Sequence, residues 1–155
     1  MGLLERHQVL VRRHANLWAC VFAGATEQKK AEVFLWEAFG TSGYCATPDQ
    51  IHFFLEPNSY DLDDLDEAYR AGVPAMDGNP NNWRLWEQEV VHELIHEYQE
   101  KVVRTVVTAE GRSLDKAIPA HQRHSGCGHD EVFYTAVVEV AKRLNMSPQV
   151  LAEHL

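Results

Sequence analysis

The sequence predicts a mainly helical α+β domain with a small β-sheet, and three observations lead to this class. Apolar residues recur at helical spacing over residues 3–23, 83–103 and 128–144, and one short segment, 50–56, is rich in aromatic and β-branched side chains. The length of 155 residues suits one domain whose core needs no disulfide or metal staple. With 45% hydrophobic and 24% charged residues, the composition is that of an ordinary soluble globular protein. We therefore predict a single domain over 1–155.

The N-terminal part of the chain predicts two helices. The first covers 3–23, and Gly24 is expected to end it. His7 and His14 fill turns of this helix, and we expect them to be half-buried helix residues rather than metal ligands. A second helix is predicted over 27–39, because apolar residues gather on one side of that segment and capping residues flank it.

The middle of the chain predicts a strand, a helix and a loop. Residues 50–56 form the clearest strand, bounded by proline-containing turns. Residues 60–71 carry several acidic side chains around an apolar stripe, which predicts a short solvated helix rather than a calcium loop. Residues 73–82 predict a loop leading into the long helix over 83–103.

The C-terminal third predicts a long loop and two helices. Residues 104–108 either continue the preceding helix or form a short β segment, and 109–125 are polar and interrupted by glycine and proline. Long loops in compact domains are often functional. The last long helix is predicted over 128–144, and a short terminal helix begins at Pro148.

The long central helix contains the pattern His92-Glu93-Leu94-Ile95-His96. Two histidines four residues apart lie one turn apart on one helix face, so both imidazoles can reach the same ion. Neutral imidazole is a preferred zinc ligand, and Glu93 is placed to take a proton from a metal-bound water, whose pKa zinc lowers to about 7. The pattern predicts a zinc-dependent hydrolase. A chain with nine histidines can also meet the pattern by chance, so unliganded histidines are the alternative.

A catalytic zinc needs a third protein ligand. The sequence offers His129, His124, His121, Glu110 and Glu131. A histidine at the start of a helix that packs across the metal helix is well placed, which favours His129, whereas His121 and His124 lie in the predicted loop. Cys127 is either an accidental neighbour of this histidine or an alternative soft ligand.

Two motifs in the chain resemble the SprT-like zinc metallopeptidases. That family carries a His-Glu-x-x-His helix, as in QEVVHELIHEYQ over residues 88–99, and a later Gly-His-x-x-x-Phe sequence on a second helix, as in residues 128–133. The resemblance implies a zincin-like metallopeptidase domain that binds Zn²⁺ and acts on a protein or peptide. The implied metal ligands are His92, His96 and His129, with Glu93 as the general base.

The chain also departs from related patterns. A metzincin would have glycine and histidine where this chain has Gln99 and Val102, which excludes that relative. A thermolysin-like site would take Glu131 or Glu110 as the third ligand in place of His129. The link between the two motifs is longer than in many SprT-like proteins, and we see no cysteine-rich zinc ribbon or DNA-binding tail. The resemblance supports the metal chemistry, but not the DNA-linked roles of some members.

The expected reaction is peptide-bond hydrolysis, in which zinc polarises the water and the scissile carbonyl and Glu93 passes the proton to the leaving amine. The possible oxyanion donors are Tyr134, His124 and His121. The carboxylates expected to orient the ligand histidines are Glu89, Glu97 and Asp130. Zinc peptidases commonly hold an extended substrate against an exposed strand edge, and 51–55 is the predicted edge, with an interior strand as the alternative.

Charge and cysteine content limit the partners and the compartment. Lys plus Arg number 14 against 23 Asp plus Glu, and the net charge of −9 argues against nucleic-acid binding, because such a charge repels phosphates. Cys20, Cys45 and Cys127 are widely spaced, which argues against a disulfide framework and suits a reducing compartment. No apolar run approaches the roughly 18 residues of a membrane span. Residues 6–25 resemble a signal peptide only superficially, so we expect a cytoplasmic protein, with secretion as the alternative.

Two other functions stay open at this point. One is a zinc hydrolase of a small amide, or a peptidase restricted to a single protein target such as a repressor. The other is a non-catalytic zincin-fold binding or regulatory module in which a structural metal contributes folding energy. Glu93 argues against the second, because a structural site has no use for that carboxylate. The sequence gives neither the cleavage preference nor the oligomeric state.

Overall fold

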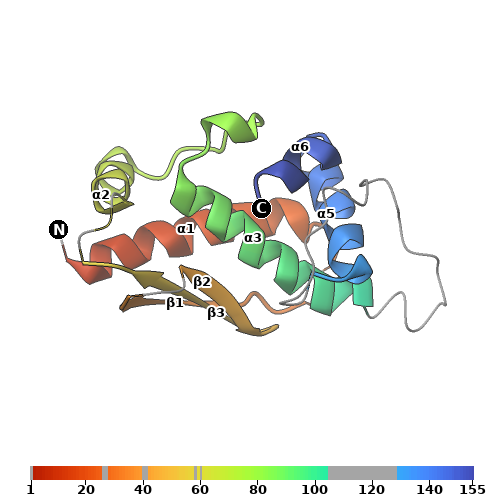
Figure 1. Ribbon diagram of the computed structural model, residues 1–155, viewed down its shortest axis with the longest axis horizontal. Helices are drawn as coiled ribbons and strands as arrows, with labels where there is room; N and C mark the ends of the chain where they lie inside the picture. Colours follow the sequence, from red (N-terminus) through yellow and green to blue (C-terminus); the bar gives the residue numbers. More distant parts are fainter. Residues whose placement is uncertain (1, 26–27, 40–41, 58, 60, 105–128) are drawn as a thin grey trace.

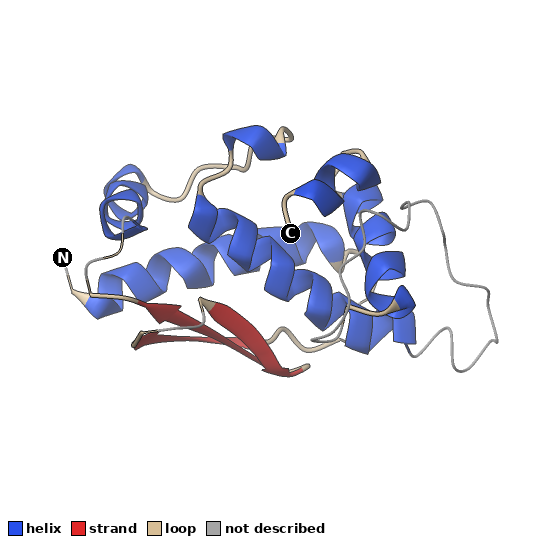
Figure 2. Cartoon of the chain, viewed as in Figure 1, coloured by secondary structure: helices blue, strands red, loops and turns tan. Residues whose placement is uncertain are grey.

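The computed structural model describes residues 2–25, 28–39, 42–57, 59, 61–104 and 129–155. Figures 1 and 2 show helices lying over one face of a small sheet. The elements in chain order are α1 Leu3–Val21, β1 Glu32–Glu37, β2 Gly43–Thr47, β3 Gln50–Leu55, α2 Asp61–Ala71, a 3-10 turn η1 Pro80–Asn82, α3 Leu85–Tyr98, a π-helical turn η2 Gln99–Val103, α5 Glu131–Arg143 and α6 Pro148–Glu153. The predicted α+β class is confirmed. None of the described helices is long and apolar enough to cross a membrane.

The sheet has the strand order β1-β3-β2, with β1 parallel and β2 antiparallel to β3. Along β3, Ile51, Phe53 and Leu55 are buried, while His52 and Phe54 alternate with them and are partly exposed. This confirms the predicted strand. The prediction that residues 51–55 offer a free edge is wrong and the alternative of an interior strand holds, because β3 pairs on both sides, and β2 is an edge of the described sheet.

The helix predicted over 27–39 is also wrong where the structure describes it, since residues 32–37 form β1. The run EVFLWE is rich in β-branched and aromatic side chains, and it gains a partner in β3, where Val33 lies opposite Ile51. Val33 is buried, whereas the rings of Phe34 and Trp36 stack with His52 at centroid distances of 4.7 and 6.2 Å. Cross-strand pairing therefore outweighs the helical spacing of the apolar residues.

The remaining predicted helices are present. Gly24 has φ 87°, a left-handed conformation that suits the end of α1, and Asn145 ends α5 with φ 59°. The Asp130 side chain caps α5 by accepting a hydrogen bond from Phe133 N. In Figure 1, α1 and α3 lie side by side above the sheet and α5 lies against the C-terminal end of α3. The core is formed mainly between these helices and β3.

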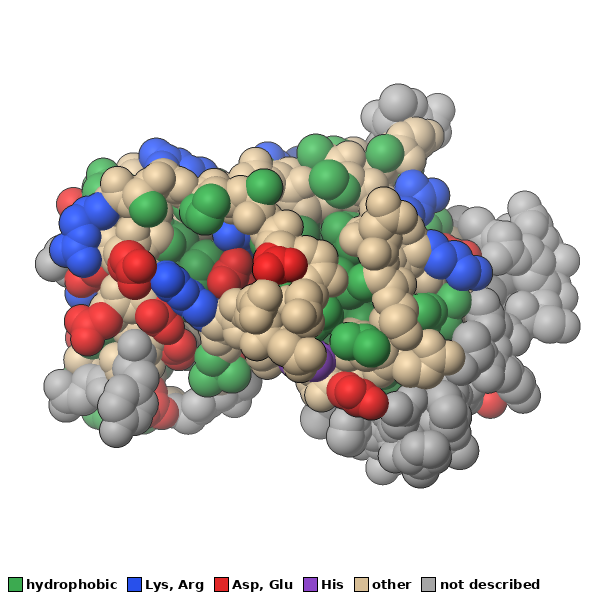
Figure 3. Space-filling view, turned by 90° about the horizontal axis from the view of Figure 1, so that it is seen from above, with side chains coloured by type: hydrophobic (Ala, Val, Ile, Leu, Met, Phe, Trp, Pro, Cys, Tyr) green, Lys and Arg blue, Asp and Glu red, His purple; other side chains and the backbone are tan. Residues whose placement is uncertain are grey.

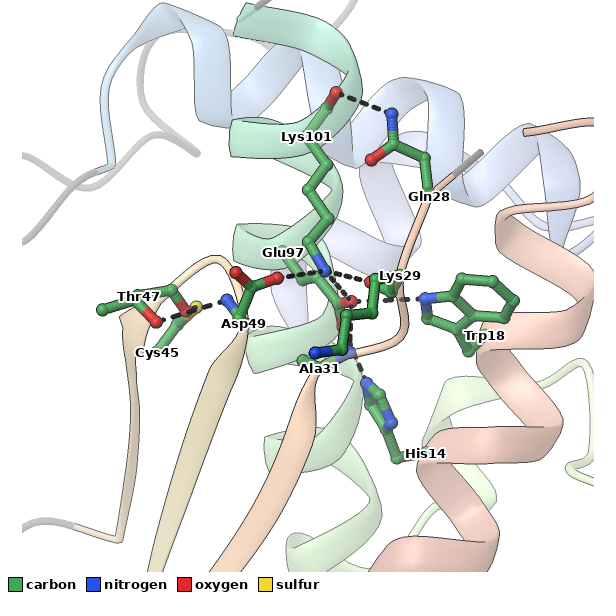
Figure 4. Close-up of polar contacts among 10 residues, drawn as sticks. All are labelled: His14, Trp18, Gln28, Lys29, Ala31, Cys45, Thr47, Asp49, Glu97 and Lys101. Carbon is green, nitrogen blue, oxygen red and sulfur yellow. Dashed lines mark hydrogen bonds and ion pairs between the residues drawn. The ribbon is translucent and has the colours of Figure 1, made fainter. Parts of the chain in front are cut away.

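A buried carboxylate joins these elements (Figure 4). Glu97 of α3 is fully buried and accepts hydrogen bonds from His14 Nε2 at 2.8 Å, Trp18 Nε1 at 3.2 Å and Ala31 N at 3.0 Å. It also pairs with Lys101 Nζ at 3.0 Å. Glu97 therefore ties α1, the segment before β1 and the π-turn together and does not orient the ligand histidines, contrary to the prediction. His14, expected to be half-buried, is fully buried by the same contact.

We predict that Glu97→Ala lowers the free energy of unfolding by about 3–5 kcal/mol, because it leaves buried donors without an acceptor. Urea denaturation of the metal-free protein measures this. Glu37→Ala, at an exposed position at the end of β1, should change the same quantity by less than about 0.5 kcal/mol. Equal losses in the two variants would contradict a structural role for Glu97.

Candidate metal centre

Three histidine side chains meet between α3 and the start of α5. His92 and His96 lie one turn apart on α3, and His129 precedes the capping residue of α5. The Nε2 atoms of His96 and His129 lie 3.2 and 3.1 Å from Nε2 of His92. Three nitrogens bound to one tetrahedral zinc at about 2.0–2.1 Å would lie about 3.3 Å apart. The structure thus brings the three predicted ligands together at the spacing that a metal ion requires.

The orientation of His96 is fixed by a side chain that sequence reasoning did not identify. His96 Nδ1 lies 2.9 Å from Gln99 Oε1 and donates to it, which leaves the Nε2 lone pair directed at the other histidines. Burial also lowers the pKa of His96, so the neutral, ligating form is favoured. Gln99 in turn donates from Nε2 to Asp130 Oδ1 at 3.3 Å, and Asp130 directly follows His129. A chain of hydrogen bonds therefore runs from His96 through Gln99 to Asp130, the residue next to His129 in the sequence.

The π-turn η2 begins at Gln99. Turns of this kind are frequent at functional sites, because the wider backbone displaces a side chain from its regular helical position. Gln99 is buried and lies three residues after His96, so both side chains share one face of the helix. That spacing was the signal available in the sequence. Asp130 orients the site as predicted, but it acts through Gln99.

Phe133 forms an apolar floor beneath the histidines. Its ring centroid lies 4.4 Å from that of His129, 4.6 Å from His96 and 5.8 Å from His92, and the side chain is buried. Close ring packing of this kind fixes the imidazole planes and keeps water from that side of the site. Phe133 is the aromatic residue of the second motif. Its spacing in the sequence indicates only a core residue, but in the structure it contacts the histidines directly.

Glu93 lies beside the histidines and is only 5% exposed. Its carboxylate accepts a hydrogen bond from the backbone N–H of Cys45 on β2, but its Oε2 atom is buried without a hydrogen-bond partner among the described residues. Burial and the negative charge of Glu89 raise the pKa of Glu93 to about 8, and the Cys45 N–H opposes this. A buried carboxylate oxygen that the protein leaves unpaired fits a site that receives a cation and a water.

Two cavities open onto this centre. One of about 440 Å³ extends along the first turns of α3, and one of about 520 Å³ lies between β2 and the histidines. Gly43, His92 and Glu93 line both cavities, so they form one groove between the edge strand and the metal helix. On the face drawn in Figure 3, seen from above, a small histidine surface is visible close to an acidic side chain.

The other predicted site residues lie elsewhere. Glu131 is exposed on the first turn of α5 and does not join the histidine cluster. Tyr134 is buried edge-on against Phe133 at 5.1 Å and lines neither cavity, so it is not placed as an oxyanion donor. Glu89 accepts a hydrogen bond from Ser42. The remaining candidates, Glu110, His121, His124 and Cys127, lie outside the described residues.

No known protein family, curated protein or solved structure matches this chain. The resemblance to the SprT-like metallopeptidases therefore rests on the two sequence motifs, and the chemistry has to be inferred from the geometry of the site.

We predict that the wild-type protein, purified without added metal, holds near-stoichiometric zinc and that His129→Ala loses it, because two histidines alone hold the ion weakly. Elemental analysis measures the metal content. His154→Ala is the matched control: this histidine lies at the wall of the smaller cavity, but its ring nitrogens bind Val150 O at 2.9 Å and Asn81 Oδ1 at 3.0 Å. Full zinc retention in His129→Ala would assign the third ligand to another residue.

We further predict that Gln99→Ala weakens zinc binding about 10- to 100-fold, the usual effect of removing a group that orients a ligand histidine. Competition with a chromophoric chelator gives the dissociation constant. Gln149→Ala, at an exposed position on α6, should leave the constant unchanged. An unchanged constant in Gln99→Ala would show that the hydrogen bond to His96 does not tune the site.

Proposed function

We propose that this protein is a zinc-dependent metallopeptidase with a zincin-like, SprT-like domain. The observation that carries the proposal is the convergence of three histidine Nε2 atoms beside Glu93, whose buried Oε2 atom is unpartnered among the described residues. Zinc bound by these histidines would polarise a carbonyl and lower the pKa of a water to about 7. We also propose a cytoplasmic location, because Cys20 and Cys45 are free thiols, as a reducing compartment favours.

In this proposal Glu93 is the general base. Its carboxylate is held by the Cys45 N–H from β2 and by its position on a buried helix turn, which leaves one oxygen for proton transfer. Glu93 takes the proton from the attacking water and gives it to the leaving amine. The low polarity around the carboxylate increases its basicity towards that proton, because burial disfavours the charged form.

The substrate we propose is an extended polypeptide held along β2. This strand pairs with β3 on one side, and no described strand pairs with its other side. Residues 43–48 line the larger cavity together with the histidines, so a peptide that pairs with the strand would pass directly over them. The candidate edge thus moves from 51–55 to 43–47. A groove of this kind favours a polypeptide over a small amide.

The alternative is a non-catalytic zincin-fold module with a structural metal. A structural zinc is usually enclosed by four protein ligands, whereas here two cavities open onto the histidines. The described residues add no fourth His, Cys, Asp or Glu to the cluster. A buried Glu93 with an unpaired oxygen lowers the stability of the fold, and a purely structural metal site would have no use for it.

We predict that Glu93→Gln lowers the rate of peptide cleavage about 10²- to 10⁴-fold, the usual contribution of a general base, while zinc stays bound in full. The zinc-loaded proteins are incubated with a mixed peptide library, and mass spectrometry counts the cleaved products. Glu32→Gln, at an exposed position on β1, is the control and should cleave normally. Equal cleavage by Glu93→Gln and wild type, or none by either, would overturn the proposal.

A further inference from the structure

The smaller cavity next to the candidate metal centre is lined by acidic side chains. It begins at His92 and Glu93 and runs along α3 towards Leu85. Among the described residues, its lining includes three acidic side chains and no Lys or Arg. The acidic residues are Glu89, Glu93 and Glu153. A lining with acidic and no described basic side chains favours a cationic group.

Glu89 is the carboxylate best placed to act on a substrate. It is half-buried one helical turn before Glu93, and a Cβ atom at Gly43 would lie 3.5 Å from its Oε2, so it lies against the edge strand. Ser42 donates a hydrogen bond to it, yet burial still raises the pKa of Glu89. No described Lys or Arg forms an ion pair with this carboxylate, although its charge is felt by Glu93.

Three other buried or half-buried acids on α3 and η2 have basic partners, whereas Glu93 and the half-buried Asp61 have none among the described residues. Glu87 pairs with Arg13 at 3.0 Å, Glu97 with Lys101 at 3.0 Å and Glu100 with Arg104 at 2.9 Å. Charges withdrawn from water are costly unless they are paired, which explains those contacts. Glu89 differs from those three paired acids, and it lies in the cavity where a substrate would lie.

The cavity also suits the carbon chain of a basic residue. Its volume of about 440 Å³ accommodates a long side chain, and Leu85, which is 59% exposed, forms part of its wall. Lys and Arg place their methylene stems on apolar surface and their charged ends on polar groups. Leu85 and Glu89 lie four residues apart on α3 and so share one face of the helix. One bound side chain can therefore place its methylene stem on Leu85 and its charged end on Glu89.

We infer that this protein selects polypeptides with Lys or Arg next to the cleaved bond, whose side chain lies along Leu85 and pairs with Glu89. The inference rests on the proposed peptidase function and adds the substrate class to it. Glu89 is then a specificity-determining residue. It was expected from the sequence to orient a ligand histidine, whereas its contacts direct it to the substrate cavity.

The test uses a peptide that zinc-loaded wild-type protein cleaves in the library, resynthesised with Lys, norleucine or Glu at the position next to the bond. Wild type should favour the Lys peptide over the norleucine peptide by about 10- to 100-fold in kcat/KM, the effect of a hydrogen bond between charged groups. In Glu89→Gln this ratio should fall to about threefold or less, and Glu32→Gln should keep the wild-type ratio. Glu89→Lys should invert the preference towards the Glu peptide.

A second readout avoids turnover. Fluorescence anisotropy of labelled peptides on zinc-loaded Glu93→Gln should show tighter binding of the Lys peptide than of the norleucine peptide, and a further Glu89→Gln change should remove the difference. Cleavage of all three peptides at similar rates by wild type would overturn this inference and leave the peptidase proposal intact. A Lys preference that survives in Glu89→Gln would overturn the role of Glu89. No cleavage of any peptide by wild type would overturn the proposed function and this inference with it.

Discussion

The buried carboxylate of Glu97 is the interaction on which the arrangement of this protein depends. A carboxylate taken fully out of water is tolerated only when nearly all of its lone pairs accept hydrogen bonds, and Glu97 achieves this with donors from α1, the segment before β1 and the π-turn. Glu97 directly follows His96 on α3. The bonds to Glu97 therefore fix the rotation of the helix about its axis, and with it the direction of the His96 side chain. The same set of bonds that joins the helices therefore sets the direction in which His96 points.

A second set of bonds fixes the opposite side of α3. Gln99 joins His96 to Asp130, and Asp130 is both the cap of α5 and the neighbour of His129. Gln99 thus links the end of α3 directly to the cap of α5, and this hydrogen bond helps to hold His96 near His129. Phe133 then closes the site from below through contacts with all three imidazoles. The spacing of the three histidines therefore depends on the contacts at the end of α3 and the start of α5.

Local spacing in the sequence was enough to predict the helix over 83–103 and the strand at 50–55, because helical and strand periods act over a few residues. The choice of His129 rested instead on its place at the start of a helix and on the second motif. It was not enough for β1, whose apolar spacing suits a helix until β3 supplies a partner. Strand order depends on the same long-range pairing, so the sequence could not indicate that β2 is an edge. Glu97 looks like an ordinary surface acid in the sequence, and Gln99 acquires its role only through the π-turn.

Glu89, Glu93 and Glu97 recur every four residues along α3 and differ in how far the protein satisfies them. Glu97 has four partners and serves the fold, whereas Glu93 keeps a buried oxygen without one and Glu89 has a serine but no described cation. In a carboxylate that only stabilises the fold, a buried oxygen without a hydrogen bond lowers stability, because no contact offsets the desolvation of that oxygen. A buried acid that lacks hydrogen-bond partners within the protein therefore indicates a site for a substrate, a water or an ion. Along α3, Glu97 is fully hydrogen-bonded and holds the fold behind the histidines. Glu93 and Glu89, which are not fully hydrogen-bonded by described residues, line the groove, and these are the two that we propose act on the substrate.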